Sequence, residues 1–139
     1  MEKDLKDLLL VDLCARLPYS VKILVQSWDE REMEYTNRVD TLYSVYGDNY
    51  INTTNEDYDF YVEDIKPYLF PLSSMNEGQK NFIRFKLTIP KHDSFDEDSL
   101  EDLIHNNIQV VRFCYKNHLD INGLIPMGLA IDATNLNIY

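Results

Sequence analysis

Residues 21–62 read VKILVQSWDEREMEYTNRVDTLYSVYGDNYINTTNEDYDFYV, and this stretch decides the expected fold. Apolar and polar residues alternate from 21 to 26, which is the two-residue period of a strand. Three further strands are expected within 32–46, 50–54 and 59–62, which are rich in Tyr, Thr, Val and Ile. Short strands joined by tight turns predict a small, strongly curved antiparallel sheet, either open or closed as an SH3-like barrel. The turn signals lie at 29–31, 47–49 and 55–57.

Helices are expected on both sides of this sheet. Leucines at helical spacing predict an amphipathic helix over 3–17, which Pro18 ends because the residue before a proline avoids helical geometry. Ser74 and Glu77 match a capping box, so a helix is expected over 74–84, while the pattern of 83–89 fits a helix or a strand.

The segments after the sheet complete the expected fold. One Lys-Pro step and one Phe-Pro step bracket a connector at 66–71. This connector is expected to follow an extended or one-turn helical path. A long amphipathic helix is expected over 99–118, and an apolar tail at 124–131 is expected to pack on the core. The prediction is therefore an α+β fold in one domain, 1–139, made of a helix (1–18), a β-region (19–64) and a mainly helical part (65–139).

The charge of the chain is concentrated in the β-region. Residues 29–64 hold eleven carboxylates against Arg31 and Arg38, which accounts for −9 of the net charge of −11. The same block holds six tyrosines, whereas 65–90 is the one net basic stretch. Such a surface repels nucleic acid and attracts cations or basic proteins.

No motif in the chain indicates catalysis, a cofactor or a metal. The three histidines, His92, His105 and His118, have no ligand spacing for zinc, and His118 is interpreted as a cap favoured by a helix dipole. The acidic segment 93–98 lacks the glycine and glutamate spacing of a calcium loop. Cys14 and Cys114 lie in apolar helical patterns and are expected to be reduced, buried and inert.

The N-terminal region is neither a predicted membrane span nor a predicted secretory signal, and this bears on the expected location of the protein. Its longest apolar run, at 8–11, is far shorter than the roughly 20 residues that a membrane span needs. The charged start does not match a secretory signal. We therefore expect a cytoplasmic protein without a membrane partner.

Three segments carry a resemblance to a known group of proteins: DLCARLPY at 12–19, IKPYLFPLSSM at 65–75 and HLDINGLIPMGLA at 118–130. In this order they resemble an uncharacterised family of small proteins encoded by Bacteroides-type gut bacteria and by their phages and mobile elements. The resemblance spans most of the chain and implies a phage or mobile-element origin, but no catalytic residues. The long 29–64 block departs from the family pattern.

The leading hypothesis is a non-enzymatic, phage-encoded interaction protein. Its acidic, tyrosine-rich surface would bind and block a basic surface of a host protein, such as a defence factor that grips nucleic acid. Tyrosine supplies a large contact area at low entropic cost, and carboxylates supply charge complementarity. The residues expected to bind the partner are Tyr35, Tyr43, Asp48, Tyr50, Glu56, Asp57 and Asp59.

Two alternatives stay open beside this hypothesis. One is a protein that sequesters a small molecule, such as a nucleotide signal, on the basic cluster Lys80, Arg84, Lys86 and Lys91. The other is a structural or assembly protein of the phage particle, with the apolar tail at 123–131 as a contact between copies. A homo-oligomer is therefore one of the arrangements left open.

Overall fold

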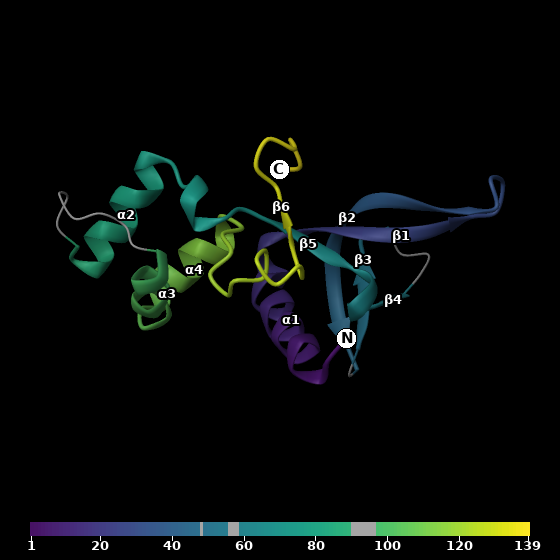
Figure 1. The fold of residues 1–139 in the computed structure, drawn as a ribbon, viewed down its shortest axis with the longest axis horizontal. Helices are drawn as coiled ribbons and strands as arrows, with labels where there is room; N and C mark the ends of the chain where they lie inside the picture. Colours follow the sequence, from purple (N-terminus) through teal and green to yellow (C-terminus); the bar gives the residue numbers. More distant parts are fainter. Residues whose placement is uncertain (48, 56–58, 90–96) are drawn as a thin grey trace.

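A computed structural model describes residues 1–47, 49–55, 59–89 and 97–139 of the chain. It is an α+β fold with an N-terminal helix, a six-stranded sheet and C-terminal helices, as the sequence predicts (Figure 1). The helices are α1 (Lys3–Arg16), α2 (Glu77–Leu87), α3 (Glu97–His105) and α4 (Ile108–Lys116). The strands are β1 (Lys22–Asp29), β2 (Glu34–Tyr46), β3 (Tyr50–Thr53), β4 (Asp59–Tyr61), β5 (Lys66–Leu69) and β6 (Ile131–Asp132). Three short 3-10 turns are η1 (Leu17–Tyr19), η2 (Val62–Asp64) and η3 (Leu72–Ser74).

The sheet is open and curved. Its strand order is β4-β3-β2-β1-β5-β6, with antiparallel pairs throughout except between β5 and β6. Although β4 and β5 are far apart in this order, only η2 and Ile65 separate them in the chain. Such a short connection requires the sheet to curl on itself. Of the two predicted forms, the curved open sheet is the one that forms.

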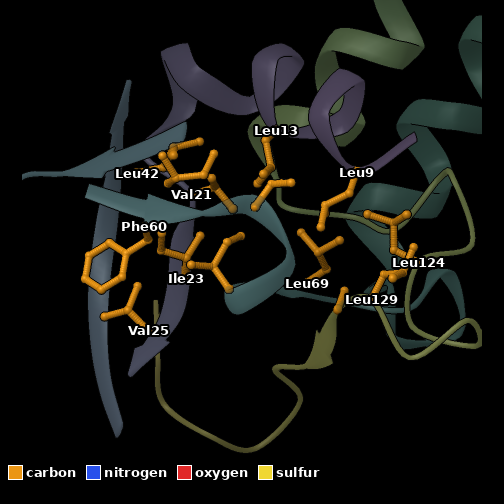
Figure 2. Close-up of a cluster of buried hydrophobic side chains, with 14 residues drawn as sticks. Leu9, Leu13, Val21, Ile23, Val25, Leu42, Phe60, Leu69, Leu124 and Leu129 are labelled. Atoms are coloured by element: carbon orange, nitrogen blue, oxygen red, sulfur yellow. The ribbon is translucent and has the colours of Figure 1, made fainter. Parts of the chain in front are cut away.

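Two hydrophobic cores lie side by side. The first fills the concave side of the sheet, where Leu9 and Leu13 of α1 pack with strand residues such as Ile23 and Leu69 (Figure 2). The second joins η3 and the three C-terminal helices and contains Ile83, Ile104, Val110 and Cys114. The elongated shape in Figure 1 follows from this arrangement, with α2, α3 and α4 at one end and the sheet, with α1 against it, toward the other.

A buried ion pair joins these two cores at the C-terminal end of α1. The Nε of Arg16 donates to Oδ1 of Asp12 at 2.6 Å, and both side chains are fully buried. The Nη2 of Arg16 reaches the carbonyl oxygen of Leu119 at 2.8 Å, and the guanidinium lies 4.8 Å from the ring centre of Tyr115. Asn122 donates to the same Asp12 carboxylate at 2.7 Å. The first helix is thereby tied to residues of the second core.

Two of the predicted helix boundaries are wrong. The helix expected over 99–118 is two helices, because the side chain of Asn107 accepts from the backbone amides of Gln109 and Val110 and starts α4. The capping box belongs to Asn76 and Gln79. Ser74 lies in η3, so α2 begins three residues later than expected.

The ambiguous segment 83–89 is helical through Leu87. Thr88 ends the helix in the left-handed region, with φ of 56°. The alternating pattern of this segment does not lead to a strand, since the chain here continues a helix already nucleated at Asn76.

The connector and the tail are both part of the sheet. The connector, expected to follow an extended or one-turn helical path, forms β5, which pairs with β1 on one side and β6 on the other. The tail packs on the first core, as predicted, through the buried Leu124 and Leu129. Both oxygens of the Asp120 carboxylate accept backbone amides at the start of this tail, from Leu124 at 2.8 Å and Ile125 at 2.9 Å.

Two interpretations of single residues need correction. Cys14 is exposed, because it lies on the side of α1 opposite Leu9 and Leu13. Cys114 is buried as expected, and burial raises the pKa of its thiol to about 12. His118 is not a charged cap of a helix, because burial lowers its pKa to about 4 and leaves the ring neutral at pH 7.

Candidate partner-binding surface

The convex side of the sheet, opposite the first core, carries a series of exposed apolar side chains. Along β2, Leu42 points into the core, while Tyr35 and Val39 fall on the other side of the strand. The pairing register sets Trp28 opposite Tyr35 on this side. We call this side the outer face; its exposed apolar residues are Trp28, Tyr35, Val39, Tyr43, Tyr46, Tyr50 and Tyr61.

One end of the outer face lies on a two-stranded arm, residues 26–37. β1 pairs with β5 only through Ile23 and Leu24, and β3 pairs with β2 only from Leu42 onward, so the arm continues beyond both neighbours. Figure 1 shows it projecting away from the rest of the molecule. The arm carries four carboxylates against one arginine, a net charge of −3.

The tip of the arm exposes large apolar side chains. Trp28 is 46% exposed, Tyr35 is 68% exposed, and their rings meet edge to face with centroids 5.0 Å apart. Met33, in the turn, is 72% exposed and has a φ of 55°. The carboxylate of Asp29 accepts the amides of Arg31 and Glu32 and orders this turn.

The other end of the outer face is a ladder of tyrosines on three strands. Tyr46, Tyr50 and Tyr61 lie directly opposite one another in β2, β3 and β4. The rings of Tyr46 and Tyr50 are stacked with centroids 5.5 Å apart, and those of Tyr50 and Tyr61 are 5.4 Å apart. Cross-strand aromatic pairs of this kind hold a sheet surface in a defined shape.

Asp59 lies beside this ladder and is coupled to it. Its carboxylate accepts a hydrogen bond from Tyr46 and another, at 3.1 Å, from Nδ2 of Asn52. The bond from Tyr46 is the main reason why the pKa of Asp59 lies below its usual value. The same bond raises the pKa of Tyr46 to about 12, with smaller contributions from burial and from the charges of Asp59 and Tyr50.

We expect Asp59→Asn to bring the pKa of Tyr46 down from about 12 toward its usual value of 10. The depressed pKa of Asp59 stabilises the folded state above the unfolded carboxyl pKa, and this contribution is lost as pH falls through the folded value. For Tyr46 the contribution is present below pH 10 and is lost as pH rises through about 12. NMR titration of labelled tyrosine rings measures the change.

Asp64→Asn is the matched control, since it removes one exposed carboxylate near the end of β4. It should leave the Tyr46 titration unchanged. An Asp59→Asn variant in which Tyr46 still titrates near pH 12 would show that the hydrogen bond does not form.

The structure divides the predicted partner-binding residues between two places. Tyr50 and Asp59 lie in the tyrosine ladder, and Tyr35 lies at the arm tip. Tyr43 lies between them, at a β-bulge, and is 62% exposed. Tyr35 and Tyr46 are eleven positions apart in β2, or about 36 Å along an extended strand. The remaining three, Asp48, Glu56 and Asp57, lie outside the described residues.

Some acids of the 29–64 block are not available to a partner. Asp40 is only 6% exposed, because its carboxylate accepts from Arg38 at 2.8 Å and from the hydroxyl of Thr53 at 2.9 Å. Glu63 pairs with Lys6 of α1 at 3.2 Å. Three of the four carboxylates of the arm, by contrast, are exposed.

Sequence reasoning missed Trp28 and Met33 of the arm. The signal for Trp28 was present, because it continues the alternation of β1 on the side opposite Ile23 and Val25. A strand with apolar residues on both sides reads as buried on both sides, so exposure could not be inferred from the pattern.

The basic cluster proposed for a small molecule lies on α2, where its residues have local partners. Lys80 pairs with Glu77 at 3.7 Å, and the ammonium of Lys86 lies 5.8 Å and 5.7 Å from the ring centres of Phe82 and Phe85. Arg84 is half-buried, and Lys91 lies outside the described residues.

The described part of the chain holds no group of three His, Cys, Asp or Glu side chains that could bind a metal ion. Within those same residues, no helix is both long enough and apolar enough to cross a membrane. Comparison with protein-family models, with curated proteins and with solved structures found no match.

Proposed function

We propose that this protein is a non-enzymatic interaction protein that uses the acidic arm and the outer face to bind a basic surface of another protein. The observation that carries this proposal is the arm itself, which presents Trp28, Met33 and Tyr35 on an acidic hairpin with no core beneath it.

The arm has few contacts of its own to stabilise it, so a contact with a partner would explain its presence. A two-stranded hairpin without a packed face is marginally stable in water. Its tip exposes Trp, Tyr and Met, which are the residue types enriched at the centres of protein interfaces. A stable protein complex covers about 800 Å² on each partner, so such an interface would have to extend from the arm onto the rest of the outer face.

The charge of the surface indicates the kind of partner. The arm that bears the exposed rings also carries four carboxylates against one arginine, and the chain as a whole carries −11. A basic surface would be attracted at long range and then held by the aromatic side chains, while nucleic acid would be repelled. The resemblance to phage-encoded proteins makes a nucleic-acid-binding host protein, such as a defence factor, the first partner to test.

The proposal is tested by capturing partners from a bacterial host lysate with the whole chain. Glu30→Lys, Glu32→Lys and Glu34→Lys together reverse the charge of the arm. The control reverses three exposed acids of the N-terminal region, with Glu2→Lys, Asp4→Lys and Asp7→Lys. We expect a basic partner that is captured by the native chain and the control, lost from the arm variant, and released by salt.

Capture that survives both the arm reversal and high salt would contradict the proposal. The alternative role as an assembly protein through the tail gains no support, since Leu124 and Leu129 are buried in the first core of the same chain.

A further inference from the structure

A polar cavity of about 360 Å³ lies at the junction of the two cores, away from the outer face. Its lining comes from three parts of the chain: the segment from Phe70 to Gln79, the end of α4 with residues 116–119, and Tyr139. The volume falls near the lower end of the range for small-molecule sites, so a small ligand fits it best.

Three aromatic side chains form one wall of this cavity. The rings of His118 and Tyr139 are stacked with centroids 3.8 Å apart, and Phe70 lies 5.7 Å from Tyr139. The hydroxyl of Tyr139 donates to the carbonyl of Tyr68 at 2.7 Å and accepts from the amide of Lys22 at 2.9 Å. Both rings of the stack are therefore held in place before any ligand arrives.

The backbone next to this wall is fixed by hydrogen bonds. The amide of Phe70 donates to the carbonyl of His118 at 2.8 Å, and the carbonyl of Phe70 accepts from Asp120 at the same distance. His118 has a φ of 59°, in the left-handed region that a residue with a side chain enters at a cost. Strained backbone of this kind is concentrated at functional sites.

The electrostatics of the cavity differ from those of the chain. The net charge is −11, yet among the side chains of the described residues that line the cavity Lys116 is the charged one, and no lining side chain is an Asp or a Glu. Burial first, and then the positive charges of Arg16 and Lys22, lower the pKa of His118 to about 4. The His118 ring is therefore neutral at pH 7, and Lys116 is the charged side chain of the lining.

On the polar rim of the cavity, the ammonium of Lys116 is the group suited to bind an anion. The side chains of Asn76 and Gln79 are engaged in the capping box of α2, and the amide of Asn117 donates to the carbonyl of Phe113 at 2.8 Å. The ammonium of Lys116 is exposed at the same rim. A ligand with one planar ring and one anionic group would therefore complement the aromatic wall and the single cation of Lys116.

We propose that this cavity binds a small planar aromatic molecule that carries a single carboxylate or phosphate. The ring lies against Phe70, His118 and Tyr139, and the anionic group lies at Lys116. The inference is independent of the proposed partner surface, since the two share no residue.

The test is an NMR titration of the whole, amide-labelled chain with five probes. 4-Hydroxybenzoate and adenosine monophosphate carry both a ring and an anionic group, adenosine and phenol carry the ring alone, and inorganic phosphate carries the anion alone. We expect saturable shifts at the amides of 116–119 with the two probes that combine both features. Their dissociation constants should be at least ten-fold lower than those of the single-feature probes. Whichever combined probe binds more tightly distinguishes a carboxylate from a phosphate ligand.

Lys116→Glu should weaken binding of the combined probes by ten-fold or more, whereas Lys3→Glu, the same change on exposed α1, should leave it unchanged. Lys116 is exposed, so the variant is expected to fold, and unaltered shifts in the rest of the spectrum will show that it does. Absence of saturable shifts at 116–119 with both combined probes overturns the proposal. Equal binding of phosphate alone, or unchanged binding by Lys116→Glu, overturns it as well.

Discussion

Replacing Asp12 with alanine is expected to lower the free energy of unfolding by about 3–5 kcal/mol, because the substitution leaves a buried guanidinium without its counter-charge. Arg16 and Asp12 are both 0% exposed and are joined by two hydrogen bonds of 2.6 and 3.1 Å. Asn122 also loses its acceptor. Urea denaturation of the native chain and the variant measures the difference.

Asp7→Ala is the matched control, since Asp7 lies on an exposed side of the same helix. Its effect should be below about 0.5 kcal/mol. The double variant Asp12→Leu, Arg16→Met should recover most of the lost stability, because burying two apolar side chains removes the unpaired charge. If Asp12→Ala costs no more than Asp7→Ala, the ion pair does not join the two cores.

The second large effect is expected on binding. Trp28→Ala together with Tyr35→Ala should weaken the affinity for the captured partner by about 2 kcal/mol or more, which is about 30-fold. These rings are 46% and 68% exposed, lie on the arm and belong to neither core, so the global free energy of unfolding should change by less than about 1 kcal/mol. Calorimetric titration of the purified pair measures the affinity.

Phe85→Ala is the control for this experiment, because Phe85 is a 77% exposed aromatic residue on α2, outside the outer face. It should leave the affinity unchanged. Amide exchange across residues 26–37 separates a lost contact from a lost hairpin. If the arm keeps its protection and the affinity does not fall, the Trp28–Tyr35 pair does not contribute to binding the partner, and the prediction is wrong.

These two predictions concern parts of the molecule with opposite physical character. The Asp12–Arg16 pair is charge placed where water cannot reach, and its effect is on stability. The arm is apolar surface placed where water can reach it, and its effect is on recognition. Both are departures from ordinary burial, both follow from how the sheet and the helices are assembled, and the effect of the arm on recognition is a prediction.

Local patterns were sufficient for the elements that depend on neighbouring residues. The leucine period of 3–17 and Pro18 marked α1, and the alternation from Val21 marked β1. The turns at 29–31 and 47–49 divided the first three strands correctly, since turn residues act within a few positions of one another.

Local patterns failed where two segments offered competing signals. Ser74 and Asn76 are both good caps, and the choice between them depends on Ser74 donating its hydroxyl to Pro71 within η3. The helix expected over 99–118 is interrupted because Asn107 caps a new helix, although the apolar pattern continues across it. The spacing of apolar residues predicts which side of a helix is buried, but it does not predict where the backbone changes direction.

The candidate surface was only partly accessible to prediction for the same reason. The concentration of acids and tyrosines at 29–64 is a property of composition and could be counted. Which of these side chains are exposed depends on pairing. Asp40 is buried and hydrogen-bonded with Arg38 and Thr53, whereas Trp28, just outside the block, is exposed. The cavity at Lys116 could not be foreseen, because its walls come from segments more than sixty positions apart, as with Phe70 and Tyr139.

The amino-acid order therefore accounts for the α+β class, the first helix, the strand-turn pattern and the negative charge of the β-region, because each depends on residues close together in the chain. Tertiary structure decided the rest: the open curved sheet, the arm that extends past its neighbours, the exposed tyrosine ladder and the ion pair between the cores. Exposure and pairing are relations between distant segments, so they exist only once β5 has joined β1 and the C-terminal tail has closed on α1.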